Sequence, residues 1–416
     1  MKSRSLLLLA LGTGFVVSAF ACSETSDAPA WDSSSDDTTD ASRPDASLPE
    51  TSASVEDASV PDVVEPYDGS PAPVACDGSP CVVRLVGGPS VFCGVIDDGT
   101  VRCWGEPSLV GGAPDDGSDP NPGPAAIAGI AGAIDIAITS SNVCAVLGDG
   151  GVDCWDAVDR TPVRSSDAPS TLRLALGAEM SCAVALNGDL DCWGDSALFG
   201  SGLRTVGLGG RKAVDVAVTD TAAFVLDDEG TLCSWGARGV TLGRSTSLDV
   251  DDVPRPVVGL PPVRSFAASA SHVCAVTTDG RLFCWGNGTN GLLGVGHARD
   301  ESEPADVSFA QGDWPFQISA ADSHSCARLT NGEVACWGGG NTWGELGFAT
   351  RSAAYVPSKL TTLAPDIVAV ATGLSSSCAL TKGGAVWCWG DDRSGQLGQG
   401  KEDSSRHWTP TQVTFP

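Results

Sequence analysis

The chain has 416 residues, of which 42% are hydrophobic and 18% charged, and its formal net charge at pH 7 is −28. An acidic balance of this size repels phosphate backbones and argues against nucleic-acid binding. Only the N-terminal segment is apolar enough to be a candidate membrane segment, and its apolar run is too short to span a bilayer.

Residues 1–21 form a predicted signal peptide. Two basic residues precede an apolar run over residues 6–20, which suits a secretory export signal. Ala19-Phe20-Ala21 is a small-x-small cleavage site directly before Cys22, and the site resembles those of bacterial lipoproteins. The resemblance implies lipidation of Cys22 and a place on the outer membrane or cell surface. A plain secreted N-terminus is the alternative.

Residues 22–75 form a predicted disordered linker rich in Ser, Asp, Thr, Ala and Pro. Residues 22–80 contain 14 acidic residues and a single Arg, so this segment cannot bury enough apolar surface to offset its ordering entropy. We expect it to be a flexible tether, with a merely solubilising spacer as the alternative. Cys76 and Cys81 then enclose a Gly- and Pro-containing loop and are expected to form a small disulfide.

From residue 82 a hairpin unit repeats seven times, with spacings of 51, 38, 42, 50, 52 and 52 residues, which indicates a repeat architecture. The repeats centre on Trp104, Trp155, Trp193, Trp235, Trp285, Trp337 and Trp389. Each has two apolar segments joined by a turn with glycine at a fixed position, such as Gly280. A left-handed residue ends a three-residue hairpin loop, and glycine adopts that conformation without steric cost.

This turn fixes the register, which places Cys274 opposite Cys284. Directly opposed residues of antiparallel strands lie roughly 4.5 to 5.5 Å apart, within the range that a disulfide accepts. The same register pairs Cys93 with Cys103, Cys144 with Cys154, Cys182 with Cys192, Cys326 with Cys336, and Cys378 with Cys388. We therefore expect six cross-strand disulfides, with reduced core cysteines as the alternative.

The fourth repeat has Phe224 and Ser234 at these two positions, and such joint loss is what a bonded pair predicts. Cys233 lies one residue before Ser234, so its side chain should point to the opposite face of the strand. By the register it faces Val225, which cannot bond to it. We therefore expect Cys233 to be a buried free thiol.

Each repeat contains four short apolar segments, and the fourth follows a proline, as in Pro304, Pro357 and Pro410. Four short strands in 38 to 52 residues, repeated seven times without a sustained helical period, predict an all-β seven-bladed β-propeller over residues 76–416. We expect a truncated outer strand in the short second repeat. We also expect the two ends of the ring to be neighbours, in one blade or across the closing seam.

The repeats resemble the regulator of chromosome condensation repeat, a family of seven-bladed propellers. The resemblance rests on His324-Ser-Cys326-Ala, Asn331-Gly332, Trp337-Gly338, Gly344-Glu-Leu346-Gly347 and Gly395-Gln-Leu397-Gly398. It covers roughly residues 82–416, and the second and third copies lack a clear Gly-x-Leu-Gly. The paired cysteines resemble an adaptation to an oxidising compartment. The founding member is a nuclear exchange factor, but fold resemblance does not carry function.

The sequence offers little chemistry. His272 and His324 share a repeat position that other copies fill with Val, Asn, Met, Ala or Ser, so we expect them to be structural, bonding between loops. The acidic loop Asp115–Asp119 suits calcium, although a solvated loop explains it better. We find no phosphate loop, nucleophile elbow or metal motif, and expect no cofactor and no enzyme activity.

The remaining prediction is a surface-anchored or secreted, monomeric binding scaffold that uses one face or the loops of the propeller to bind a protein. Trp314, Trp343 and Trp408 lie outside the repeated tryptophan position and are the candidate aromatic contacts with a partner. An extracellular propeller that binds or cleaves polysaccharide is the alternative.

Overall fold

In the computed structural model, the hairpin of each repeat forms with the register that the sequence predicts. Cys274 lies opposite Cys284, and Gly280 at the turn has a φ of 83°. The equivalent glycines of the other six repeats have φ values between 79° and 85°. The turn therefore needs glycine in every copy, because other residues rarely adopt this left-handed conformation.

The structure describes residues 73–78, 80–110, 123–158, 161–166, 168–196, 200–349 and 352–416. The predicted signal peptide, Cys22, nearly all of the predicted linker and the loop Asp115–Asp119 lie outside these residues. No helix in the described part is long and apolar enough to cross a membrane.

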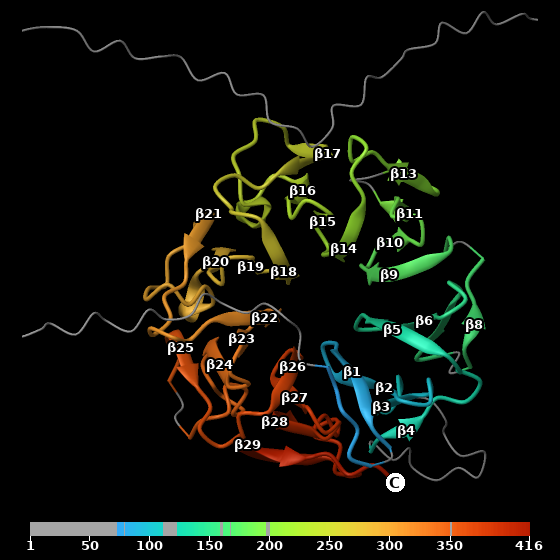
Figure 1. The fold of residues 1–416 in the computed structure, drawn as a ribbon, viewed down its shortest axis with the longest axis vertical. Helices are drawn as coiled ribbons and strands as arrows, with labels where there is room; N and C mark the ends of the chain where they lie inside the picture. The colour runs from blue at the N-terminus through green and yellow to red at the C-terminus, as the bar shows by residue number, and fades with distance from the viewer. Residues whose placement is uncertain are drawn as a thin grey trace, which may run out of the picture. The chain divides into compact units, whose positions relative to one another are not determined.

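The strands form seven antiparallel sheets, one for each repeat, arranged as the blades of a ring (Figure 1). The prediction of an all-β seven-bladed propeller is therefore confirmed. The first strand of each blade lies nearest the centre of the ring. These inner strands are β1 (Val82–Gly87), β5 (Ala133–Ile138), β9 (Thr171–Leu176), β14 (Ala213–Val218), β18 (Val263–Ala268), β22 (Pro315–Ala320) and β26 (Ile367–Thr372).

The second and third strands form the hairpin of each blade, and their side chains are largely buried on both faces. The second strands are β2 (Val91–Ile96), β6 (Asn142–Leu147), β10 (Met180–Ala185), β15 (Ala222–Asp227), β19 (His272–Thr277), β23 (His324–Leu329) and β27 (Ser376–Thr381). The third strands are β3 (Val101–Gly105), β7 (Val152–Asp156), β11 (Leu190–Ser196), β16 (Leu232–Ala237), β20 (Leu282–Gly286), β24 (Val334–Gly338) and β28 (Val386–Asp392).

The outer strands vary in length. They are β4 (Ala125–Ala126), β8 (Val163–Arg164), β12 (Gly200–Ser201), β13 (Arg204–Val206), β17 (Val250–Pro256), β21 (Glu301–Asp306), β25 (Ala354–Lys359) and β29 (Asp403–Gln412). The expected truncation in the second blade is confirmed, since β8 has two residues. Two 3-10 turns, η1 (Val240–Leu242) and η2 (Thr289–Gly291), precede β17 and β21.

The expected position of the prolines was wrong. Pro304, Pro357 and Pro410 lie inside β21, β25 and β29 rather than before them. In β21 and β25 the proline lies where the register with the third strand shifts. An edge strand tolerates proline at such a bulge because no neighbouring strand needs its missing N–H.

The apolar core is divided into seven clusters, each formed mainly by two adjacent blades. The repeated tryptophan of one blade packs on the loop between the third and fourth strands of the preceding blade. Trp285 donates its indole N–H to the carbonyl of Thr241, and Trp337 donates to Leu292. The Gly-x-Leu-Gly motif thus holds neighbouring blades together.

The ring closes between blade seven and blade one. Each blade is continuous in sequence, so this seam depends on side-chain packing and on the two ends of the ring. Ala75 and Val82 donate backbone N–H groups to Lys382 and Gly384 at the hairpin turn of blade seven. The C-terminal end of the ring reaches across the same seam from blade seven to blade one, since Val413 and Phe415 belong to the cluster around Trp104. The ends are therefore neighbours across the seam, as expected.

The structure joins the six cysteine pairs that the register suggests, and it also joins Cys76 to Cys81. The six hairpin pairs have Cα–Cα distances of 4.0 to 4.1 Å, and the Cys76–Cys81 pair has 5.7 Å.

The prediction for Cys233 is wrong in part. It lies opposite Val225 and is buried between blades three and four, as expected. Yet it is not a free thiol, because it is disulfide-bonded. The hairpin register determines only which residue lies opposite Cys233 in the same sheet. It does not exclude a disulfide with a cysteine far away in the sequence.

Candidate binding site on one face of the ring

The loops of the propeller gather on its two faces. Because the strands are antiparallel, the connections between first and second strands and between third and fourth strands lie on one face, which we call the loop face. The turns between second and third strands lie on the opposite face, which we call the hairpin face. Variation between the repeats is concentrated in the loop-face connections that follow each Trp.

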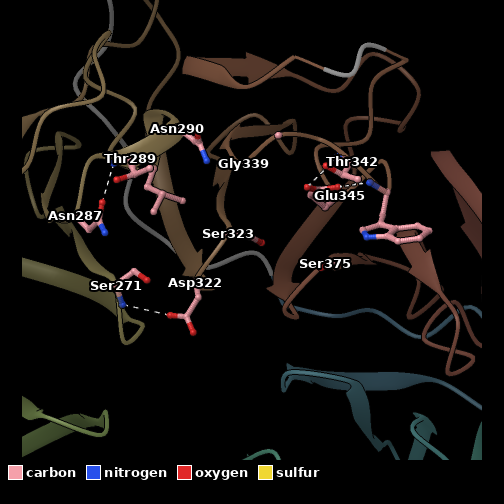
Figure 2. A pocket seen from close by; sticks show the side chains of 13 residues that line it. Ser271, Asn287, Thr289, Asn290, Asp322, Ser323, Gly339, Thr342, Glu345 and Ser375 are labelled. Atoms are coloured by element: carbon pink, nitrogen blue, oxygen red, sulfur yellow. Dashed lines mark hydrogen bonds between the residues drawn. The ribbon is translucent and has the colours of Figure 1, made fainter.

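A pocket of about 440 Å³ opens on the loop face between blades five and six (Figure 2). Its walls come from the first-to-second loops of blades five, six and seven and from the third-to-fourth loops of blades five and six. The lining residues are Ser271, Asn287, Thr289, Asn290, Leu292, Asp322, Ser323, Gly339, Gly340, Thr342, Trp343, Glu345 and Ser375. The lining is mostly polar and contains no Lys, Arg or His.

Beside this pocket, blade six departs from the repeat. In blades five and seven, the residue after Trp-Gly donates its backbone N–H to the first-to-second loop, as Asn287 does to Ser271 and Asp391 to Ser375, each at 2.9 Å. In blade six, Gly338, Gly339 and Gly340 follow the tryptophan, and within the described residues no backbone N–H is bonded to the Ser323 carbonyl. Gly338 and Gly339 nevertheless stay close to this carbonyl, since a Cβ on either residue would lie 3.2 or 2.8 Å from the Ser323 oxygen.

Strained backbone lies beside this hollow. Asn290 has a φ of 56° and Asn341 a φ of 45°, and they are the only non-glycine residues with positive φ in the described part of the chain. Asn290 lines the pocket and Asn341 lies in its glycine-rich wall. Such outliers persist only where the surrounding structure enforces them, and they concentrate at functional sites.

Two carboxylates face the pocket. Glu345 is only 4% exposed, and its two oxygens accept the backbone N–H groups of Thr342 at 3.2 Å and Trp343 at 2.9 Å. Asp322 is exposed and accepts the N–H of Ser271 at 3.3 Å. Neither carboxylate has an ion pair with a basic side chain in the described parts of the chain.

A second hollow, of about 270 Å³, continues along the loop face toward blade one and shares Ser375 with the first pocket. Arg393 lines it, 4.1 Å from the centre of the Trp343 ring. The carboxylate of Asp391 holds that guanidinium, with Arg393 Nε 2.8 Å away, and the ion pair raises the pKa of Arg393. Arg393 is therefore engaged by Asp391 and Trp343.

The three tryptophans proposed as partner contacts are half-buried rather than exposed, and they do not form one surface. Trp343 lines the loop-face pocket. Trp314 lines a different hollow on the hairpin face. Trp408 lies on β29 and packs on Gly344 of blade six. Their contact with a partner remains a prediction, which the loop face best supports for Trp343.

The histidines have the structural place that the sequence suggests, although their bonds join strands rather than loops. His272 Nε2 lies 2.6 Å from Ser325 Oγ of the next blade, and His324 Nε2 lies 2.6 Å from Ser377 Oγ. Burial lowers the pKa of His272 to about 4 and that of His324 to about 3. Both rings are fully buried and unable to reach a substrate.

No three His, Cys, Asp or Glu side chains gather into a possible metal site within the described residues. Of the features found here, sequence reasoning missed the pocket itself. Its signal was the run of glycines after Trp337, which interrupts the repeat in one copy only.

Fold and site together define a β-propeller with a polar pocket on its loop face. Comparison with known proteins shows which repeat family its sequence matches. A model of the regulator of chromosome condensation (RCC1) repeat matches residues 279–328 and 383–416, and a second RCC1 repeat model matches residues 263–292, 317–342 and 367–396. The chain therefore contains RCC1 repeats in a seven-bladed propeller.

A solved structure of yeast RCC1 (Prp20), bound to Kap60, has a TM-score of 0.66 and 19% identity, covering 83% of this chain and 88% of that chain. Among curated proteins, the mitochondrial RCC1 domain-containing protein RUG3 of Arabidopsis thaliana is 33% identical over 192 residues, which cover 44% of this chain and 43% of the relative. The human E3 ubiquitin-protein ligase HERC2 is 33% identical over 196 residues, 46% of this chain and 4% of the relative. The chain thus matches less than half the length of these two curated relatives.

Proposed function

We propose that this protein is an exported, non-enzymatic scaffold that binds a protein partner on the loop face, held at the cell surface or secreted. The observation that carries this proposal is the pocket between blades five and six, where one repeat departs from the others. It offers hydrogen-bonding groups and a half-buried tryptophan but no cluster of catalytic groups. Yeast RCC1, which shares the fold, is described as bound to Kap60 and as binding Gsp1p and histones.

Paired cysteines support the proposed export, because disulfides persist in oxidising compartments. A polysaccharide ligand fits this face less well. Sugars stack on free aromatic rings, whereas the Trp343 ring has the Arg393 guanidinium 4.1 Å from its centre.

The test is affinity capture from surface extracts of the source organism, with the ring domain as bait and two matched variants. Gly340→Trp adds a large ring to the pocket lining, because Gly340 is exposed and a Cβ there has Thr342 Oγ1, at 3.2 Å, as its one close neighbour. Ser308→Trp places the same ring at an exposed position on the hairpin face. We expect a partner that the parent and Ser308→Trp retain and Gly340→Trp loses. Equal retention by all three proteins would refute binding at this site.

A further inference from the structure

The pocket on the loop face contains negative charge that the described residues leave without a basic partner. Glu345 is 4% exposed, and only backbone N–H groups satisfy its carboxylate. A buried carboxylate without a counter-charge is costly. Asp322 lines the same pocket, so the lining contains two carboxylates and no basic side chain.

The rest of the lining suits a group that only donates hydrogen bonds. Ser, Thr and Asn side chains supply oxygens, and the Ser323 carbonyl receives no backbone N–H in the described part of the chain. Guanidinium and ammonium groups carry several donors and no acceptor. Their bonds to carboxylates are among the stronger hydrogen bonds in proteins.

We propose that this pocket binds a lysine or arginine side chain of the protein partner. The proposal rests on the proposed function, and it names the chemical group of the partner that this site recognises. A volume of about 440 Å³ lies within the range of ligand pockets, roughly 300 to 1,000 Å³. A calcium ion is the competing occupant, but it takes six to eight oxygen ligands, and Asp322 and Glu345 are the only carboxylates in the lining.

The experiment titrates the ring domain with short peptides, Ac-Gly-Gly-X-Gly-Gly-amide, and follows binding by saturation-transfer NMR. X is arginine, lysine or citrulline, and citrulline keeps the shape of arginine without its charge. We expect the arginine or lysine peptide to bind at least fivefold more tightly than the citrulline peptide. Asp322→Asn should weaken binding of the charged peptide at least fivefold.

Asp220→Asn is the matched control. Asp220 is exposed in the first-to-second loop of blade four, one residue before Thr221, as Asp322 is one residue before Ser323. It removes the same charge far from the pocket, so it should leave the affinity unchanged. Equal loss in both variants would reveal a general effect of net charge and would overturn the proposal.

Two other results would also overturn it: equal binding of citrulline and arginine peptides, or calcium that binds the parent and displaces the peptide while Asp322→Asn abolishes calcium binding. The proposed function fails separately. If Gly340→Trp loses the captured partner while Asp322→Asn retains it at parental affinity, the loop face binds a protein but not through a basic side chain.

Discussion

Asp392 and Asn341 occupy the same position in blades seven and six, and each holds the buried leucine five residues further along. Leu397 donates its N–H to Asp392 Oδ1 at 2.9 Å, and Leu346 donates to Asn341 Oδ1 at 3.0 Å. The Asn341 amide also donates to the Phe348 carbonyl at 2.8 Å. A carboxylate has no such donor, and Asp392 Oδ2 is buried without a hydrogen bond. Burial raises the pKa of Asp392 to about 6.

Asp392→Asn is therefore expected to stabilise the protein at pH 7. The amide removes a buried charge. It also supplies a donor for the blade-seven carbonyl that corresponds to the Phe348 carbonyl of blade six. A raised pKa of about 6 against 3.8 corresponds to a gain of up to about 3 kcal/mol. The gain should fade as the pH falls through 6 toward 4, where Asp392 is protonated in the parent. The thermal midpoint at both pH values measures this.

Asn341→Asp in blade six is the reciprocal control. It should destabilise the protein at pH 7 and recover partly on acidification. If Asp392→Asn has the same effect at pH 4 and pH 7, the carboxylate is not the cause.

Blade four contains a buried ion pair near its missing disulfide. Arg244 donates to Ser234, which replaces the cysteine, and its Nη2 lies 3.0 Å from Asp251 Oδ2. The side chains of Arg244 and Asp251 are 5% and 1% exposed. Arg255 contacts the same carboxylate at 3.0 Å, but its side chain is 52% exposed.

Arg244→Met should lower the free energy of unfolding by about 3–5 kcal/mol, because it leaves Asp251 buried with a weaker partner. Arg255→Met should cost about 1 kcal/mol or less, because an exposed pair is screened by solvent. Thermal denaturation of the two variants measures the difference. Equal losses would mean that the buried pair has no special role.

At the scale of the elements, the first and last segments of the ring contact each other across the seam between blades seven and one. Val413 is buried, and the Phe415 ring meets the Trp104 ring edge-on at 5.8 Å between centroids. The double variant Val413→Ala/Phe415→Ala should lose about 2–4 kcal/mol of stability, because both side chains leave the closing core. Thr414 is exposed between them, so Thr414→Ala should leave the thermal midpoint unchanged. A double variant as stable as the parent would show that other contacts close the ring.

The hairpin disulfides are elements of stability that blade four lacks. Each hairpin pair has a sequence separation of 10 residues, for which the chain-entropy model gives roughly 2 to 3 kcal/mol. Peptide mapping of the unreduced protein should find Cys76–Cys81, the six hairpin pairs and a disulfide at Cys233. Free thiols at the hairpin positions would contradict the assignment. The same map identifies the partner of Cys233.

The sequence predicts the hairpins well and the outer strands poorly. A glycine at the turn and two opposed cysteines specify register locally, so β19 and β20 could be placed residue by residue. The outer strands pair at one edge only, so pattern alone does not fix where they start. Pro304 illustrates this, since it was expected before the strand and lies within it. The run of glycines after Trp337 marks the place of the pocket, but its shape was not predictable because it depends on a loop from blade six meeting loops from blades five and seven.

At the scale of the whole molecule, buried groups of opposite kind make stability depend on pH in opposite directions. His272 and His324 have pKa values lowered by burial, so the unfolded chain takes up protons that the folded ring refuses. Their contribution to stability is complete above about pH 6.5 and is lost as the pH falls toward 4. Asp215 and Asp392 have pKa values raised to about 6, chiefly by desolvation. Their contribution is complete below about pH 3.8 and is lost as the pH rises toward 6.

Asp215 lies on an inner strand, and the charged groups that influence it include Arg173 of blade three, Asp135 of blade two and Arg84 of blade one. Arg84 Nε lies 2.5 Å from Asp135 Oδ1, and Arg173 Nη1 lies 3.6 Å from Asp135 Oδ2. The two guanidinium groups are therefore paired with Asp135 rather than with Asp215. Asp215 retains partial solvent exposure, and its weight in the balance is therefore smaller than that of Asp392, which is 0% exposed.

Between pH 4 and 6 the contributions of the two histidines and the two aspartates should oppose each other, each group contributing up to about 1.4 kcal/mol per pH unit. The slope of the thermal midpoint against pH should therefore be intermediate in the parent protein, between the slopes of two double variants. His272→Ser/His324→Ser, which introduces the residue that blade seven has at this position, should become less stable as the pH rises. Asp215→Asn/Asp392→Asn should become more stable as the pH rises, because only the histidines remain. Calorimetry at half-unit intervals measures the three slopes, and parallel slopes in all three proteins would show that other groups set the pH dependence.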